Sequence, residues 1–512
     1  MDRIDISRLS VLQKIGQVIM PRLDFREPDS LNLAKRLVRE FQVGGFIVFG
    51  GDRRSVKEAT GELQSISETP LLFGCDAERG VGQILSDMTI FPFTMSLAAA
   101  GDEELVYREA AYIASEMKEC GLNLIFAPVL DINSNAKNPI INIRSFGDDP
   151  ELVSRLGTAF IRGCQDSGIA ACGKHFPGHG RADMDSHAEM PLLDLTTENL
   201  TNFDLIPFRA AIESKVASIM TAHIALPKIE RGAIPATISD VIIQGILRKQ
   251  MGYGGVVITD SLHMSGINKL GDEIDLSHLA LKAGCDIILD PRDPYALLSR
   301  INDMAYTGEL SEGLLNDSAG RIISLKNSWL ISSQGENAPA AGKANTLIGQ
   351  IAERSVCLVK GGKLGSEKAV VCLFDVTRSC SDISRAFTVR LAESGIDFST
   401  VPVTLTSPME SVRENSEFGG AIICLIYTTV GAWKKQFQLP EFFSFVLSEI
   451  ASFNAETVLI SFGSPYVIQG MGGFDTVMCA FDSLNPCQSA AADVLLGNSE
   501  AGGKLPVRIG LY

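Results

Sequence analysis

The chain has 512 residues, a formal net charge of −16 and 46% hydrophobic residues. A single hydrophobic core stops growing near roughly 250–300 residues, so we expect one large domain and one smaller domain. The acidic balance and the lack of a run of Lys and Arg argue against attraction to phosphate backbones, and we expect no nucleic-acid partner.

The N-terminus and the cysteines indicate in which cellular compartment the protein is expected. Residues 1–20 carry Asp2 and Asp5 and no uninterrupted apolar segment, so we expect no signal peptide. No later apolar run has the length of a membrane helix. The eleven cysteines lack CxxC spacing, and those inside apolar runs behave as small hydrophobes. The sequence therefore predicts a cytoplasmic protein.

Up to about residue 330, short apolar runs alternate with amphipathic stretches, which is typical of a parallel sheet built from βα units. The expected strands are residues 16–20, 44–50, 70–76, 123–131, 170–176, 217–223, 255–260 and 285–290. Eight such units predict a (βα)8 TIM-like barrel over residues 1–331.

Most of these apolar runs end in a polar residue. The residues concerned are Asp76, Asp131, His175, His223, Asp260 and Asp290. The active site of a (βα)8 barrel is assembled at the C-terminal ends of its strands, so polar groups gathered there predict a functional site.

Residues 332–345, SSQGENAPAAGKAN, are small and polar and contain Pro and Gly, which indicates a linker. Further buried-strand runs follow at residues 355–361, 369–375, 421–427, 457–463 and 476–482. We therefore expect residues 346–512 to form a smaller α/β layered sandwich domain.

The segment CGKHFPGHGRADMDSHAEMP, residues 172–191, holds three of the six histidines: His175, His179 and His187. A nucleotide-binding GxxxxGK match at residues 168–175 is weak, because His175 stands where a Mg²⁺-binding Ser or Thr is required. A helical zinc pair is unavailable because a Pro and a Gly separate His175 from His179. A metal site formed by the loop stays open as an alternative.

Acid–base catalysis is the third interpretation of this segment. A histidine can act as a general acid and then as a general base near neutral pH, provided that another group orients its ring. Asp185 lies two residues before His187 and can accept a hydrogen bond from it. Asp260 ends the apolar run GVVITD, where it serves either as a nucleophile or as a cap of the following helix.

Several segments together resemble glycoside hydrolase family 3, and specifically its β-N-acetylglucosaminidase branch. They are residues 73–80, 126–133, 138–150, 173–191, 220–227 and 255–264, in the order of the family. KHF alone suits many members, including β-glucosidases, whereas KHFPGHG followed by DSH is similar to the N-acetylglucosaminidase signature. The terminal EAGGKLPVRIG also resembles the end of the family's second domain.

The resemblance implies a retaining enzyme that removes terminal β-linked N-acetylglucosamine from cell-wall fragments, without metal or organic cofactor. It implies that Asp260 is the nucleophile and that His187, paired with Asp185, is the acid/base. The residues implied to bind the sugar are Asp76, Arg144, Lys174 and His175.

Two positions depart from the family pattern. Ile84 stands where an arginine is common, and Arg181 follows GHG where an aspartate is usual. A β-N-acetylglucosaminide phosphorylase and a β-glucosidase of the same family stay open as enzymatic alternatives. An inactive glycan-binding barrel is the alternative from another class of protein.

Overall fold

The computed structural model describes residues 3–184, 189–331, 343–377, 382–404, 412, 420–430 and 438–511. The chain divides into two compact units. The first comprises Met1–Phe91, Val106–Asn135 and Val153–Gly342, and the second comprises Pro92–Leu105, Ala136–Leu152 and Lys343–Tyr512. Most of the expected linker, residues 332–345, lies outside the described residues.

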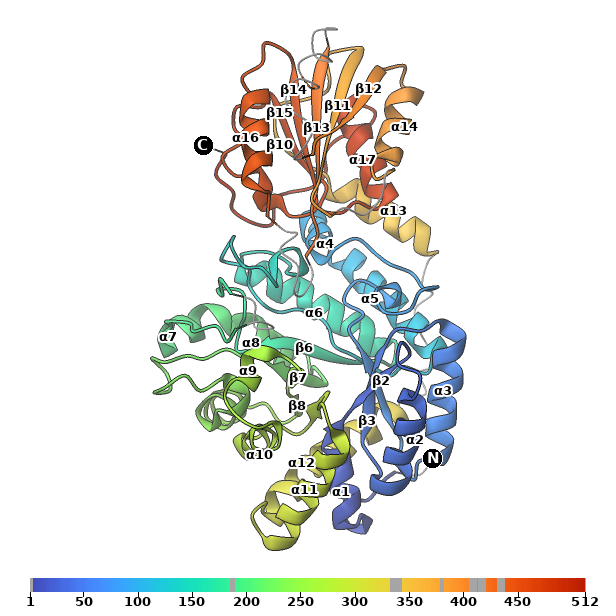
Figure 1. Ribbon diagram of the computed structural model, residues 1–512, viewed down its shortest axis with the longest axis vertical. Helices are drawn as coiled ribbons and strands as arrows, with labels where there is room; N and C mark the ends of the chain where they lie inside the picture. Colours follow the sequence, from blue (N-terminus) through green and yellow to red (C-terminus); the bar gives the residue numbers. More distant parts are fainter. Residues whose placement is uncertain are drawn as a thin grey trace. The chain divides into compact units, whose positions relative to one another are not determined.

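The first unit is built on a parallel sheet that curls into a barrel (Figure 1). Seven strands lie side by side in chain order: β2 (Arg22–Asp24), β3 (Gly45–Phe49), β4 (Leu72–Cys75), β5 (Leu124–Ile125), β6 (Ala170–Phe176), β7 (Ser218–Thr221) and β8 (Val256–Ile258). A parallel bridge joins Ile258 to Ile287, and β9 (Ile288–Leu289) pairs with β1 (Ile19–Met20), which directly precedes β2.

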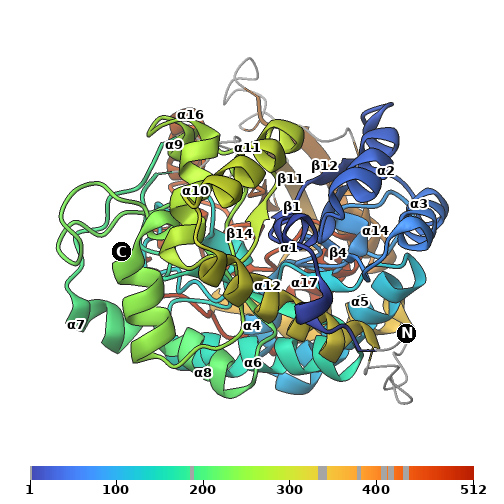
Figure 2. The same ribbon diagram turned by 90° about the horizontal axis from the view of Figure 1, so that it is seen from below.

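Helices surround these strands (Figure 2). They are α1 (Val11–Gln17), α2 (Ser30–Phe41), α3 (Arg53–Ile66), α5 (Glu103–Glu119), α6 (Pro150–Asp166), α8 (Ile206–Glu213), α10 (Glu273–Ala283), α11 (Pro294–Thr307) and α12 (Glu312–Lys326). The predicted class, a TIM-like α/β barrel accompanied by a second sheet domain, is confirmed.

The first strand begins later than the sequence pattern suggests. Ser10 and Gln13 form a reciprocal capping box at the start of α1, since each side chain accepts the backbone N–H of the other residue. This cap stabilises helix over residues 11–17. The apolar residues 16–20 therefore straddle a helix end and β1 instead of forming one strand.

The second unit contains a six-stranded sheet. Its spatial order is β10 (Cys357–Lys360), β15 (Thr476–Cys479), β14 (Thr457–Phe462), β13 (Ala421–Tyr427), β11 (Lys368–Asp375) and β12 (Asp397–Pro402). β10 is antiparallel to β15, and the other neighbours are parallel. β12 was not expected from the sequence, because this edge strand is largely exposed and carries no continuous apolar run.

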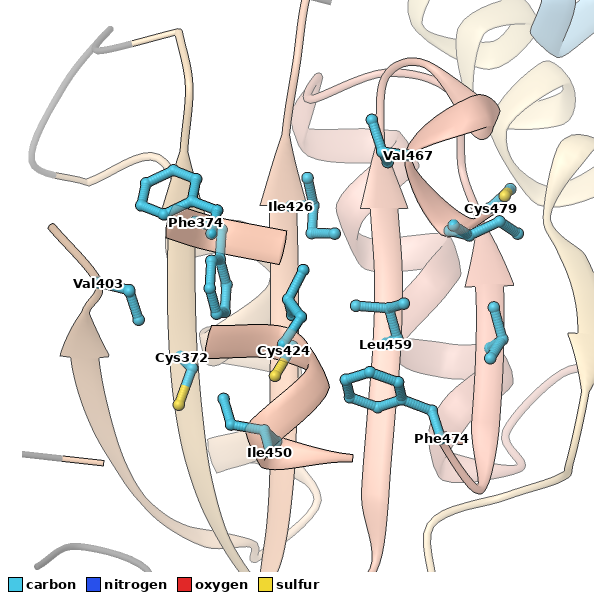
Figure 3. Close-up of a cluster of buried hydrophobic side chains, with 14 of the residues drawn as sticks. Cys372, Phe374, Val403, Cys424, Ile426, Ile450, Leu459, Val467, Phe474 and Cys479 are labelled. Carbon is cyan, nitrogen blue, oxygen red and sulfur yellow. The ribbon is translucent and has the colours of Figure 1, made fainter. Parts of the chain in front are cut away.

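Apolar layers cover both faces of this sheet. On one face, Cys372, Phe374, Cys424 and Ile426 pack beside Ile450 of α16 (Glu441–Ile450), as Figure 3 shows. The alternate residues of the same strands join the cluster that includes α14 (Arg385–Glu393) and α17 (Asn485–Leu496) on the other face. Strands buried on both faces read as continuous apolar runs, which is why the sequence revealed them.

Two segments from the N-terminal half of the chain fold with this second unit. Met95 and Ala99 of α4 (Thr94–Ala100), together with Ile143, belong to the same apolar cluster as Cys372 and Phe374. Arg354 near the end of α13 (Ala344–Ser355) pairs with Asp102 at 2.7 Å. The second unit is therefore assembled from segments that lie far apart in the sequence, since residues 153–342 separate its N-terminal parts from its C-terminal part.

The sequence-based expectations for the cysteines and for membrane helices can be compared with the structure. The cysteines at the described positions are all buried and form no disulfide. In the part of the chain that the structure describes, no helix combines the length and the apolar character that crossing a bilayer requires.

A buried amine lies where α12 packs against α1. Lys326 is fully buried, and its Nζ donates a hydrogen bond to Gln17 Oε1 at 2.5 Å. Burial lowers the pKa of this amine from 10.5 to about 7. Between these two values the unfolded chain binds a proton that the folded chain does not, so the free energy of unfolding rises with pH in this window.

Replacing this amine by an uncharged side chain should stabilise the barrel most at low pH. We expect Lys326→Met to raise the free energy of unfolding by at least about 1 kcal/mol at pH near 6.5. The gain should shrink toward about pH 10, because the wild-type chain itself becomes more stable there. Urea unfolding of both proteins across this range measures the difference, and a gain that does not change with pH would contradict the assignment.

Candidate active site

We use the term barrel mouth for the face of the barrel at which the C-terminal ends of its strands lie. At the ends of β4 and β6 on this face, a buried lysine joins two carboxylates. Lys174 Nζ lies 2.7 Å from Asp76 Oδ1 and 2.7 Å from Glu78 Oε1. The lysine side chain is 2% exposed, whereas that of Asp76 is 34% exposed. A buried ammonium is stable only with such partners. Asp76 is thereby held with part of its carboxylate accessible to a ligand hydroxyl.

The neighbouring His175 is held by Asp131, which follows β5. Asp131 is fully buried, and its Oδ2 lies 2.7 Å from His175 Nδ1. Its oxygens also accept the backbone N–H groups of His175 and His179, the latter at 2.6 Å. Burial opposes ionisation of Asp131, but the charge and hydrogen bonds of His175, aided by His179, bring its pKa below the ordinary value. An ionised carboxylate only accepts hydrogen bonds, so His175 Nδ1 carries a hydrogen.

The segment FPGHG begins at Phe176, the last residue of β6, and turns tightly against the segment that follows β5. Gly178 has a φ of +125°, and its N–H donates to the carbonyl of His175 at 2.8 Å. A Cβ on Gly180 would lie 1.8 Å from the carbonyl oxygen of Ile132, so only glycine fits there. His179 between them is buried, and burial lowers the pKa of its ring to about 4. This imidazole is therefore neutral near pH 7.

Arg181, which departs from the family pattern, anchors the same loop. Its Nε lies 2.9 Å and 3.0 Å from the two carboxylate oxygens of Asp204. Its guanidinium carbon lies 4.5 Å from the centroid of the Phe203 ring. Burial raises the pKa of Asp204 to about 6 despite the opposing effect of Arg181. Arg181 thus ties the loop to residues 203 and 204.

Asp260 follows β8 and is half-buried. Its Oδ1 accepts the backbone N–H of Ser261 at 2.7 Å. Burial raises the pKa of the Cys172 thiol on β6, and the negative charge of Asp260 adds to this effect. The same charge opposes the lowering of the His179 pKa by burial. Asp260 is therefore close enough to Cys172 and His179 to affect them electrostatically.

The structure brings together part of the set expected from the sequence. Asp76, Lys174 and His175 lie at adjacent strand ends, with Asp131 between them, and Asp260 shares the barrel mouth. Asp185 and His187, the expected acid/base pair, lie outside the described residues.

Arg144, the remaining expected sugar ligand, belongs to a segment of the second unit. Its Nη1 donates a hydrogen bond to the carbonyl of Ile140 at 2.8 Å.

Other residues of the barrel mouth were not assigned roles from the sequence. Asp131, His223 and Asp290 had one signal, their position after an apolar strand, but nothing local indicates their partners. Glu78 lies within residues 73–80, which take part in the family resemblance, but its pairing with Lys174 joins two strands that are distant in the sequence.

Comparisons with known proteins give a consistent result. Residues 10–325 match the family described as the glycosyl hydrolase family 3 N terminal domain. The chain is 39% identical over 266 residues to a β-hexosaminidase from Thiobacillus denitrificans, covering 50% of this chain and 73% of that protein. It is 29% identical over 375 residues to a β-N-acetylglucosaminidase/β-glucosidase from Cellulomonas fimi, covering 70% and 66% of the two chains.

A solved structure agrees over nearly the full length. The glycoside hydrolase family 3 β-N-acetylglucosaminidase from Paenibacillus sp. str. FPU-7 superimposes with a TM-score of 0.84 and is 30% identical. The superposition covers 98% of this chain and 100% of that one. Both units therefore have counterparts in one solved protein.

The buried carboxylate of Asp131 should contribute strongly to stability near neutral pH. Asp131→Asn retains the shape but loses the charge that holds His175, and we expect the free energy of unfolding to fall by about 1–3 kcal/mol at pH near 7. Because the folded-state pKa of Asp131 is lowered, its contribution is present above the ordinary value of 3.8 and is lost as the pH falls through the folded value. The deficit should therefore shrink in acid.

A matched variant controls for the change in stability that follows when a negative charge is removed from the surface. Asp194 pairs with Lys228 at 2.8 Å and its side chain is 77% exposed, so Asp194→Asn should change stability by no more than about 0.5 kcal/mol. If urea unfolding shows that the two substitutions lower the free energy of unfolding equally, the buried Asp131 carboxylate does not stabilise the site.

Proposed function

The chain belongs to glycosyl hydrolase family 3 and is a glycoside hydrolase, and from this premise we propose that it is a retaining exo-β-N-acetylglucosaminidase. The observation that carries the proposal is the grouping of Asp260 with Asp76, Lys174 and His175 at one barrel mouth. The named activities of its relatives favour an N-acetylhexosamine as the sugar that is released.

The nucleophile in this proposal is Asp260. Its carboxylate oxygen attacks the anomeric carbon while the bond to the leaving oxygen breaks, and that oxygen takes a proton from His187. The glycosyl ester that forms is then attacked by a water whose proton passes to His187, which releases the sugar with retained configuration. Asp185 orients the His187 ring and stabilises its cationic form. A histidine thus replaces the usual second carboxylate.

Sugar binding in this proposal uses groups whose orientation is fixed by buried partners. Asp76 accepts hydrogen bonds from sugar hydroxyls while Lys174 balances its charge. Since Asp131 occupies Nδ1 of His175, the opposite ring nitrogen, Nε2, is left to interact with the substrate. Fixed ring and carboxylate orientations reduce the entropy that is lost when the sugar binds.

We further propose that the natural substrates are cell-wall fragments and that the protein acts in the cytoplasm. The cysteines at the described positions are buried and unbridged, which supports a reducing compartment. Two enzymatic alternatives use the same residues. In a phosphorylase, phosphate replaces water in the second step, whereas a β-glucosidase accepts a sugar without the acetamido group. Product analysis with and without phosphate distinguishes the first alternative from hydrolysis.

The acetamido sugar should be the preferred substrate. We expect kcat/KM for nitrophenyl β-N-acetylglucosaminide to exceed that for nitrophenyl β-glucoside by at least about tenfold, or ~1.4 kcal/mol of transition-state discrimination. Asp260→Ala, assayed in parallel, sets the background. Equal or faster cleavage of the glucoside would favour the β-glucosidase alternative, and absence of any turnover would favour an inactive glycan-binding barrel.

The contribution of His187 should depend on the leaving group. We expect His187→Ala to lower kcat/KM by ~10²–10⁴ for a sugar leaving group, which needs a proton, and only weakly for dinitrophenolate. Asp185→Ala should give the same pattern more mildly, because it acts only through the ring. The measurement is kcat/KM against leaving-group pKa for wild type and both variants.

His278→Ala serves as the matched control, since His278 lies on α10 with Glu309 as its neighbour at 3.9 Å. It should leave the dependence on the leaving group unchanged. A His187→Ala slope no steeper than that of the wild type would reject His187 as the acid and make His179 or Asp183 the next candidate.

A further inference from the structure

The residue after the proposed nucleophile is held from two sides. Ser261 donates its hydroxyl hydrogen to Asp290 Oδ2 at 2.7 Å. Its carbonyl oxygen lies 3.1 Å from Nε2 of His223. The N–H of the same residue donates to Asp260 Oδ1. Ser261 therefore connects the proposed nucleophile to two buried groups on other strands.

Asp290, the first of these groups, is itself firmly fixed. It is 1% exposed, and its backbone N–H donates to the carbonyl of Met20 on β1. Its two carboxylate oxygens each lie 2.7 Å from a nitrogen of Arg22 on β2, and this hydrogen bonding raises the pKa of the guanidinium. The paired geometry leaves Asp290 little freedom to rotate. Its position ties β9 to β1 and β2.

His223, the second group, is fully buried at the end of β7. Its Nδ1 lies 2.8 Å from Thr237 Oγ1. A carbonyl oxygen only accepts hydrogen bonds, so Nε2 carries the hydrogen in the contact with Ser261. The ring is thus held at both nitrogens between β7 and the loop after β8.

We propose that Asp290, fixed by Arg22, and His223 are positioning residues that set the direction of the Asp260 carboxylate through Ser261. Anchoring both the hydroxyl and the carbonyl of Ser261 fixes the orientation of its peptide N–H, and the carboxylate follows the N–H that it accepts. Attack on an anomeric carbon is sensitive to such placement, since a misplacement of about 1 Å can cost on the order of 10²-fold in rate.

This inference rests on the proposed function, because it assumes that Asp260 is the nucleophile. The charges of these residues give a second argument for the inference. A second carboxylate near Asp260 would repel it, but Arg22 balances Asp290. Asp290 can therefore hold Ser261 without adding an uncompensated negative charge beside the nucleophile.

The experiment removes one hydroxyl and leaves the buried ion pair intact. Ser261→Ala loses the contact with Asp290 but keeps Asp290 bonded to Arg22. We expect kcat/KM for dinitrophenyl β-N-acetylglucosaminide to fall about 10–100-fold. The inhibition constant of free N-acetylglucosamine should stay within about twofold, because sugar binding does not use Ser261. The loss should be the same for good and poor leaving groups, unlike that of His187→Ala.

Two comparisons make the result specific to positioning. Ser261→Thr keeps a hydroxyl and should recover activity to within about threefold of the wild type. Ser218→Ala removes another buried barrel hydroxyl, which donates to the carbonyl of Ala171, and should leave kcat/KM unchanged. A purely structural role would lower Tm in both alanine variants without separating their kcat/KM values.

A second variant covers the case in which Ser261→Ala does not fold. Asp290→Asn keeps an accepting oxygen but weakens the pairing with Arg22, and we expect about a 3–10-fold loss of kcat/KM with an unchanged inhibition constant. A folded Ser261→Ala or Asp290→Asn protein with wild-type kcat/KM on the activated substrate would overturn the inference. A wild-type protein that cleaves no β-glycoside would instead overturn the proposed function.

Discussion

The barrel mouth depends on the buried carboxylate of Asp131. This side chain accepts hydrogen bonds from the ring and backbone of His175 and from the backbone of His179. It therefore joins the segment after β5 to β6 and to the residues that follow β6. An unpaired charge at that depth would be strongly unfavourable. The donors that stabilise Asp131, which are the ring and backbone of His175 and the backbone of His179, are therefore also the groups whose orientation it fixes.

The same segment shows how neighbouring residues acquire different roles. Lys174 and His175 are adjacent in β6, yet the lysine pairs with Asp76 and Glu78 whereas the histidine pairs with Asp131. The two side chains therefore organise carboxylates that follow two different strands. Polar residues at the ends of buried strands can reach such partners because parallel strands end together at one face of the barrel.

Much of the fold followed from continuous apolar runs, because strands buried on both faces have few polar positions. The pattern failed where burial is partial or where helix signals dominate, as in the exposed strand β12 and the helix capped by Ser10. It also could not show that Met95 and Ile143 pack with residues of the second unit. Which unit these residues join depends on long-range packing, and the local periodicity of the sequence does not reveal it.

The candidate site could be predicted only in part, for the same reason. Strand ends and the family resemblance point to Asp76, Lys174, His175 and Asp260, whose roles stay predictions. The contacts of Ser261 with Asp290 and His223 join separate strands and leave no local signal. The predicted pair Asp185 and His187 lies outside the described residues.

Charge balance explains why so many carboxylates can share this barrel mouth. Asp76 and Glu78 share Lys174, Asp131 is surrounded by N–H donors, and Asp290 is paired with Arg22. Each of these carboxylates has hydrogen-bond donors that are themselves held in place, and Lys174 supplies one positive charge for the two carboxylates that it contacts. The neutral ring of His179 adds no positive charge that would compete with a substrate for this carboxylate. In the proposed mechanism an ionised Asp260 attacks an uncharged sugar, and the donors around the neighbouring carboxylates limit their repulsion of that charge.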